Sequence, residues 1–289
     1  MRLGTGLAAI AALGLGWCAS LAAEPVQIEL NGRTLNGELT EAGDGPIVLI
    51  VHGTLAHNHM ELIESLQELL AEREIGSLAI TLSLGLDDRS GMYECTQPHG
   101  HHHVDAIPEI GAWLDWLAAR DHAQVVLMGH SRGGNQVAWT MAEADRPAVA
   151  GAVLLAPMTW DAAKAEAAYD AGSATPLATL LARAQAGGQL EAVRFLHCDG
   201  ATVSADSFLS YYAADPRFDT PGLLPQIAKP VLVIAGSEDA VVADLAGRLA
   251  GIDQANVTTL TVEGADHFFL DLYAEEVADA VAEFTERLP

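Results

Sequence analysis

The feature that most constrains the fold of this chain is a short motif at the end of an apolar run. Residues 125–135 read VVLMGHSRGGN, and a segment of helical character begins at Gln136. The sequence therefore predicts a buried strand, a sharp turn at Ser131 and a helix. Gly129 and Gly133 fit this interpretation, because strand and helix approach closely at such a turn and leave little room for side chains.

Apolar runs typical of strands buried on both faces alternate with segments of helical periodicity. The expected strands are 47–51, 77–82, the run from Val125, 149–155, 231–235 and 257–262, and the expected helices include 58–73, a helix capped by Asp105, 241–249 and the closing segment. Asn31-Gly32 favours a hairpin turn between 26–30 and 34–40. We expect an α/β fold with a mostly parallel central sheet, helices on both faces and an N-terminal antiparallel hairpin.

Two segments interrupt this alternation. Residues 158–225 are rich in alanine and then irregular, so we expect a partly helical cap inserted between two parts of the core, 24–157 and 226–289. Residues 83–103 form a polar loop too long to be a simple connection, and such loops commonly border functional sites.

The N-terminal segment predicts export. Arg2 precedes an uncharged apolar stretch, 3–21, which ends in small residues. This pattern is typical of a signal peptide covering the first 23 residues, with cleavage near Ala22 or Ala23 and a periplasmic or extracellular product. A membrane anchor and lipidation at Cys18 are the alternatives.

The charge balance restricts the partners. The chain has 39 acidic and 14 basic residues and a net charge of −25, and its only lysines are Lys164 and Lys229. Such a surface repels nucleic acid and anionic lipid. It also disfavours strongly anionic substrates unless a local basic patch intervenes. Beyond the N-terminal segment no run is long and apolar enough to span a bilayer. The oligomeric state stays open.

Four short motifs, each of which follows an expected strand, are similar to those of a known family. They are His52-Gly53, Gly129-His130-Ser131-Arg132-Gly133, Gly236-Ser237-Glu238-Asp239 and Gly264-Ala265-Asp266-His267. With these motifs the chain resembles the α/β-hydrolase-fold serine hydrolases over about 26–289, apart from the cap. The resemblance implies an α/β-hydrolase fold.

The resemblance also implies a catalytic triad of Ser131, Asp239 and His267, in the chain order that this fold uses. A serine hydroxyl needs a neighbouring base to remove its proton during attack, and a carboxylate orients that base. The alternatives for the acid are Glu238, Asp266 and Asp161.

Acyl transfer also needs hydrogen-bond donors for the oxyanion that develops on the substrate. The expected donors are the backbone N–H of Arg132 and that of Thr54, with Leu55 as the next choice. The guanidinium of Arg132 either contacts substrate or packs at the domain surface, and of the two we expect packing at the surface.

Cys95 and Cys198 remain after removal of the signal peptide, so either a disulfide forms in an oxidising compartment or both thiols are free. The histidines at 99, 101, 102 and 103 suggest a metal site, but adjacent residues of a loop cannot all face one ion. We therefore expect a polar loop at the pocket rim and neither metal nor organic cofactor. Six aromatic residues either line a pocket beneath the cap or pack in the interior: Trp160, Phe208, Tyr211, Tyr212, Phe268 and Phe269.

These observations predict an exported serine hydrolase that cleaves a carboxylic ester of a small or lipid-like acyl substrate through an acyl-enzyme. Thioesterase, amidase, peptidase and carbon–carbon bond hydrolase activities use the same groups and stay open. A non-catalytic binding protein on a hydrolase scaffold is the rival from another class. It requires that the triad residues fail to converge.

Overall fold

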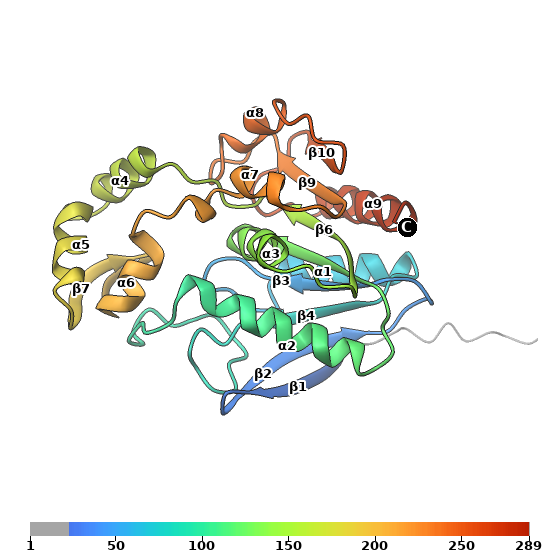
Figure 1. Ribbon diagram of the computed structural model, residues 1–289, viewed down its shortest axis with the longest axis horizontal. Helices are drawn as coiled ribbons and strands as arrows, with labels where there is room; N and C mark the ends of the chain where they lie inside the picture. Colours follow the sequence, from blue (N-terminus) through green and yellow to red (C-terminus); the bar gives the residue numbers. More distant parts are fainter. Residues whose placement is uncertain (1–22, 289) are drawn as a thin grey trace, which may run out of the picture.

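An eight-stranded sheet forms the centre of the molecule (Figure 1). The structure is a computed structural model that describes residues 23–288, so the expected signal peptide lies almost wholly outside the described residues. In sheet order the strands are β1 (Glu24–Leu30), β2 (Arg33–Thr40), β4 (Ser77–Thr81), β3 (Ile47–Val51), β5 (Val125–His130), β6 (Val149–Leu155), β9 (Val231–Gly236) and β10 (Val257–Val262).

The pairing of these strands confirms the expected fold class. β1 and β2 form an antiparallel hairpin, β2 is antiparallel to β4, and every other neighbouring pair is parallel. Asn31 and Gly32 take positive φ angles of 53° and 76° in the hairpin turn. All residues of β3, β4, β5 and β9 are buried, which explains why these strands are continuous apolar runs in the sequence.

Helices cover both faces of the sheet. They are α1 (Glu61–Glu72), α2 (Ala106–Ala118), α3 (Arg132–Glu143), α8 (Leu245–Leu249) and α9 (Leu272–Glu286). α1 packs against α9 and α2 packs against α3; α2 and α3 lie in front of the sheet in Figure 1. Among the described residues, no helix is long and apolar enough to cross a membrane.

Two helix starts differ from the prediction. The helix expected over 241–249 begins only at Leu245, because one oxygen of Asp239 accepts the amide hydrogens of Val241 and Val242 and folds these residues into a turn. Asp105 makes no side-chain cap for α2. Its carboxylate instead accepts the N–H of His102, in front of a 3-10 turn at His103–Asp105.

The cap segment, residues 158–225, contains more regular structure than expected. Its elements are α4 (Ala162–Ala171), α5 (Leu177–Gln185), β7 (Gln189–Phe195), β8 (Cys198–Ser204), α6 (Ala205–Tyr212) and α7 (Thr220–Leu223). β7 and β8 form an antiparallel hairpin that the sequence analysis did not predict. In Figure 1, α4, α5, β7 and α6 form a lobe to the left of the sheet.

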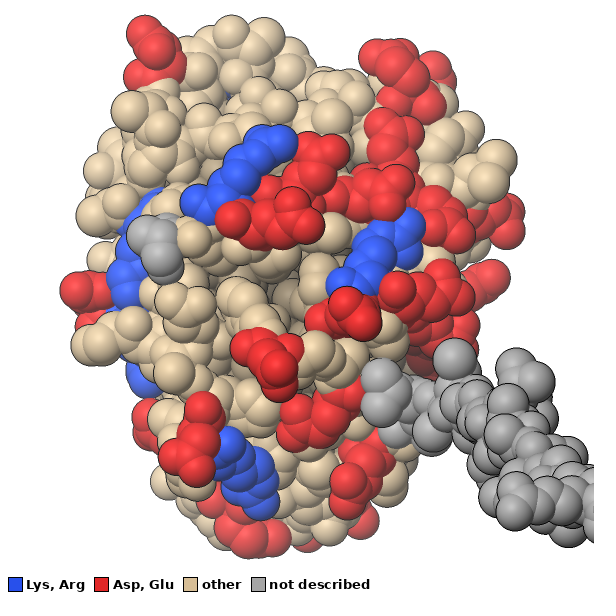
Figure 2. Space-filling view, turned by 90° about the vertical axis from the view of Figure 1, so that its right-hand side faces the viewer, with Lys and Arg blue, Asp and Glu red and all other residues tan. Residues whose placement is uncertain are grey.

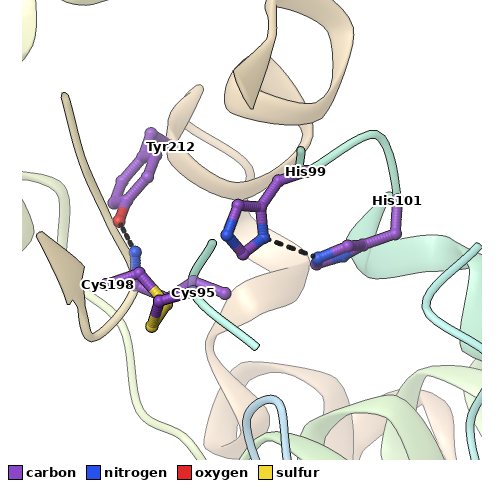
Figure 3. The surroundings of a disulfide bond; sticks show 6 residues. Cys95, His99, His101, Cys198 and Tyr212 are labelled. Carbon is purple, nitrogen blue, oxygen red and sulfur yellow. Dashed lines mark hydrogen bonds between the residues drawn. A yellow bond between two sulfur atoms is a disulfide. The ribbon is translucent and has the colours of Figure 1, made fainter. Parts of the chain in front are cut away.

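A disulfide attaches the long loop 83–103 to this lobe. Cys95 is bonded to Cys198 at the start of β8, across 103 positions of the sequence (Figure 3). His99 adds two backbone hydrogen bonds to β8, one donated to Thr202 and one accepted from Ser204. The loop and the cap segment are therefore joined by covalent and hydrogen bonds.

The surface carries the acidic excess of the sequence. On the face that Figure 2 shows, acidic side chains greatly outnumber lysine and arginine. Most of this negative charge is solvated, and it surrounds the molecule with a repulsive field for anions.

Candidate active site

Three side chains from the carboxyl ends of β5, β9 and β10 meet in one hydrogen-bonded chain. Nε2 of His267 is 2.9 Å from Oγ of Ser131, and Nδ1 of His267 is 2.7 Å from Oδ2 of Asp239. The side chains of His267 and Asp239 are buried. Ser131 has φ 57° and ψ −120°, the strained backbone of a turn that projects its hydroxyl. The structure thus brings together the three residues predicted from the sequence.

Asp239 is held as a carboxylate. Burial alone would raise its pKa, but hydrogen bonds from His267 and from the amides of Val242 and Val241 outweigh burial and lower the pKa below its ordinary value. The alternative acids lie elsewhere: Asp161 caps α4, and the carboxylate of Asp266 accepts the N–H of Phe268.

The turn after β3 lies beside the serine. A Cβ at Gly53 would stand 3.3 Å from the Cβ of Ser131. Thr54 lines the adjoining cavity, whereas Leu55 is 2% exposed and belongs to the core. Arg132 is the first residue of α3, so its backbone N–H has no hydrogen-bond acceptor within the helix. Thr54 and Arg132 both line the cavity, so their backbone N–H groups stay the candidate oxyanion donors.

His52 shapes this turn in its neutral form. Its Nε2 accepts the N–H of Leu82, which leaves the proton on Nδ1 to be donated to the carbonyl oxygen of Gly53. Burial, together with the positive charge of Arg89, lowers the pKa of His52 to about 3. A neutral imidazole is required here because a protonated ring would have no acceptor to offer.

Arg89 is a buried arginine that the sequence analysis did not single out. Its guanidinium donates to the carbonyl oxygens of Leu82, Gly91 and Ala56, at 2.6–2.7 Å, and contacts Nε2 of His52. Burial lowers the pKa of Arg89 to about 10, so the group stays charged at neutral pH. One side chain therefore fastens the turn after β3, the end of β4 and the loop 83–103.

The prediction for the Arg132 side chain was wrong. The guanidinium lines the cavity instead of packing at the domain surface. Nε donates to Oγ1 of Thr54 at 3.0 Å and Nη1 to Nδ1 of His103 at 3.0 Å, with the group stacked over the ring of Tyr211. Burial lowers its pKa. Arg132, the residue after Ser131, thus holds Thr54, which carries the second candidate oxyanion donor.

His103 extends this contact to the cap segment. Because Nδ1 accepts from Arg132, the proton is on Nε2, which donates to Oδ1 of Asn135. Nδ2 of Asn135 donates to the carbonyl oxygen of Arg217 and to Oγ1 of Thr220. Burial, and then the charge of Arg132, hold the pKa of His103 well below its ordinary value.

His99 and His101 do not belong to the expected polar rim, whereas the side chain of His102 is 37% exposed. His99 and His101 are each 1% exposed and share a hydrogen bond of 3.2 Å (Figure 3). His101 shares a second hydrogen bond with the hydroxyl of Tyr211. Both rings pack among aromatic side chains. Burial lowers the pKa of His101 to about 3 and that of His99 to about 4, so both imidazoles are neutral and can be accommodated there.

Among the described residues, the His, Cys and acidic side chains close enough to share an ion are Cys95, His197 and Cys198. Both sulfurs are consumed by the disulfide.

A cavity of about 900 Å³ opens beside Ser131 and runs beneath the cap segment. Its walls are largely apolar and come from the start of α1, from α4 and from the loop after β10. They include Met60, Leu62, Ile63, Ala165, Ala168 and Leu270. Of the six aromatic residues singled out in the sequence, Tyr212 and Phe268 line the cavity. Phe208 and Phe269 are fully buried, Tyr211 is 6% exposed, and Trp160 is partly buried beside Phe218.

Comparison with known proteins identifies the family. The model of the alpha/beta hydrolase family matches residues 48–281, and the chain belongs to this family. No sequence among the curated proteins matches it.

Several solved structures share the fold. Ferulic-acid-bound Est1E from Butyrivibrio proteoclasticus is 22% identical with a TM-score of 0.65, over 91% of this chain and 98% of that one. Esterase Pf2001 from Pyrococcus furiosus is 18% identical with a TM-score of 0.63, over 93% and 92%. A monoacylglycerol lipase from Paleococcus ferrophilus is 20% identical with a TM-score of 0.60, over 87% and 98%. These likenesses show the fold.

The buried neutral histidines predict an acid-sensitive fold. In the unfolded chain they bind protons near pH 6.5, whereas in the folded protein the pKa is about 3 for His52 and His101 and about 4 for His99 and His130. The unfolded state therefore binds more protons between these values, and stability present above pH 6.5 is lost as the pH falls. Each such histidine contributes a slope of up to about 1.4 kcal/mol per pH unit.

Urea unfolding measured from about pH 8 to about pH 5 tests this expectation. The free energy of unfolding should be nearly constant on the alkaline side and fall steeply below pH 6.5. A free energy that stays level down to about pH 5 would show that these histidines are protonated in the folded state.

Proposed function

We propose that this protein is an exported serine hydrolase that cleaves a carboxylic ester through an acyl-enzyme. The observation that carries the proposal is the continuous hydrogen-bonded chain from Ser131 through His267 to Asp239 at the wall of a large cavity. A non-catalytic binding protein has no need for this arrangement. The cavity also gives substrate a route to the serine.

In the proposed first step, Oγ of Ser131 attacks the ester carbonyl while Nε2 of His267 accepts its proton. Asp239 holds the ring in the required tautomer and stabilises the imidazolium. The N–H groups of Arg132 and Thr54 donate to the oxyanion of the tetrahedral intermediate. His267 then protonates the departing alcohol, which leaves an acyl group on Ser131.

In the second step, His267 accepts a proton from water as the water attacks the acyl carbonyl. Collapse of the second tetrahedral intermediate releases the carboxylic acid and returns the proton to Ser131. The apolar walls of the cavity favour a substrate with substantial hydrocarbon. Export is supported by the N-terminal segment and by the disulfide between Cys95 and Cys198, since such bonds persist in oxidising compartments.

Labelling and kinetics test the nucleophile. A fluorophosphonate should modify Ser131, and Ser131→Ala should lose both the label and ester turnover, by about a thousandfold or more. Ser90→Ala is the matched control, because Ser90 is an exposed serine of the loop 83–103. A panel of ester, thioester and amide substrates then identifies the bond. Labelling at another residue, or full turnover by Ser131→Ala, would refute the mechanism.

The hydrogen bond from Nε of Arg132 to Oγ1 of Thr54 gives a second prediction. Thr54→Val preserves the shape of the side chain but removes the acceptor, so the backbone donor at 54 should lose its position. We expect kcat to fall by about tenfold, less than the loss on removing a donor altogether, with a smaller change in KM.

Thr54→Ser keeps the hydroxyl and is the control for this prediction. It should retain most of kcat. Equal kcat for the valine and serine variants would mean that the hydroxyl of Thr54 does not position the donor.

A further inference from the structure

The basic side chains of this acidic protein divide into those that pair with carboxylates and those that do not. Ion pairs involve Arg73, Arg146, Lys164, Arg217, Lys229, Arg248 and Arg287. Among the other described arginines, Arg33, Arg120 and Arg183 are exposed, and Arg89 is satisfied by backbone oxygens. Arg132 and Arg194 remain, and both line the cavity beside Ser131.

Arg132 presents unused donors to the cavity. Nε and Nη1 are bonded to Thr54 and His103, which are both uncharged acceptors. Nη2 of Arg132 makes no hydrogen bond within residues 23–288. It is also not one of the fully buried polar atoms without a partner, so it is accessible from the cavity. A largely buried guanidinium without a counter-charge is costly, so an anionic group of the ligand would stabilise it.

Arg194 adds a second positive charge to the same wall. It lies on β7, is partly buried, and forms no ion pair within the described part of the chain. A Cβ on Gly172, at the end of α4, would overlap Nη1 of Arg194, so the guanidinium packs directly on this glycine. The group is therefore held in place without being neutralised.

Tyr212 lies between the two arginines. Both positive charges act on its hydroxyl, although burial dominates and raises its pKa to about 12. Tyr212 also lines the cavity. Its hydroxyl oxygen accepts the N–H of Leu196 at 2.6 Å, and within residues 23–288 the hydroxyl proton has no acceptor. Arg132, Arg194 and Tyr212 together form a basic wall, rich in donors. The other walls of the cavity are largely apolar but also include the exposed Glu61 at the start of α1 and the exposed His197.

We propose that the substrate carries a carboxylate on its acyl chain and that this basic wall binds it. The proposal rests on the proposed ester hydrolysis and deepens it by naming the substrate class. Guanidinium and phenol groups match the planar carboxylate with several donors. A carboxylate on the acyl part would stay beside Arg132 after the alcohol has left, so the wall would act in both steps.

The net charge of −25 disfavours anionic substrates in general, but the basic wall acts on a bound carboxylate locally. Repulsion by exposed acidic groups is screened by salt over about 10 Å, whereas direct contacts inside a cavity are screened much less. Anion binding at this wall is therefore compatible with an acidic surface.

Matched substrates test the proposal. The 4-nitrophenyl monoesters of straight-chain dicarboxylic acids are compared with the 4-nitrophenyl esters of fatty acids of the same chain length. The wild-type protein should favour the carboxylate member of at least one pair in kcat/KM. In Arg194→Gln the ratio of carboxylate to neutral kcat/KM should fall by about ten- to one-hundredfold, as expected for a charge-assisted hydrogen bond.

Arg183→Gln is the control for long-range charge. Arg183 is an exposed arginine of α5, and its replacement changes the net charge by the same amount outside the cavity. It should leave the ratio unchanged, and Arg194→Lys should retain part of the preference. Equal ratios in wild type and Arg194→Gln, equal losses in both glutamine variants, or stronger selection of a phosphate-terminated ester would overturn the proposal.

A binding measurement separates this proposal from the catalytic one. Calorimetry on Ser131→Ala with a dicarboxylic acid and the matching fatty acid needs no hydrolysis. Tighter binding of the dicarboxylic acid, lost in Ser131→Ala/Arg194→Gln, supports the wall even if no ester is turned over. Ester turnover without any carboxylate preference in kinetics or binding refutes the wall and leaves the hydrolase proposal standing.

Discussion

The close contact between α3 and the end of β3 is the constraint on which the candidate site depends. A side chain at Gly133 would overlap the carbonyl oxygens of Val51 and His52, so only glycine lets the helix approach this far. The approach places Ser131 beside the turn that carries Thr54, and it directs the first amide of α3 into the same space. The nucleophile and both oxyanion donors of the proposed mechanism therefore follow from one backbone contact.

Around this contact, two arginines and two neutral histidines hold loops in place that are not paired into the central sheet. Arg89 binds three backbone oxygens and His52, and Arg132 binds Thr54 and His103. Burial, and then the charge of the neighbouring arginine, lower the pKa of His52 and of His103. Each histidine must be neutral to accept the hydrogen bond. The loop geometry and the neutral state of the imidazoles consequently depend on each other.

The sheet was predictable because buried parallel strands leave continuous apolar runs. The set Ser131, Asp239 and His267 was implied by the resemblance to a known family, and the three side chains can meet because parallel strand ends share one edge. The β7–β8 hairpin was not: its pairing is irregular and its turn uses Leu196 at φ 56° instead of an Asn-Gly pair. Arg89 gave no signal, since a single loop arginine has no pattern. His99 and His101 look polar in sequence, yet they are buried, because they pair with each other and His101 also pairs with Tyr211.

The cap segment brings groups to the cavity that the sheet cannot place, so its attachment bears on specificity. Arg194 and Tyr212 flank the β8 strand that Cys198 anchors to Cys95. Closing a loop of about a hundred residues stabilises the folded state by about 4–5 kcal/mol on the chain-entropy account. An oxidising compartment would therefore do more than protect the fold: by keeping this bond closed, it would hold the basic wall at a fixed position relative to Ser131. Export and substrate selection would then share one structural requirement.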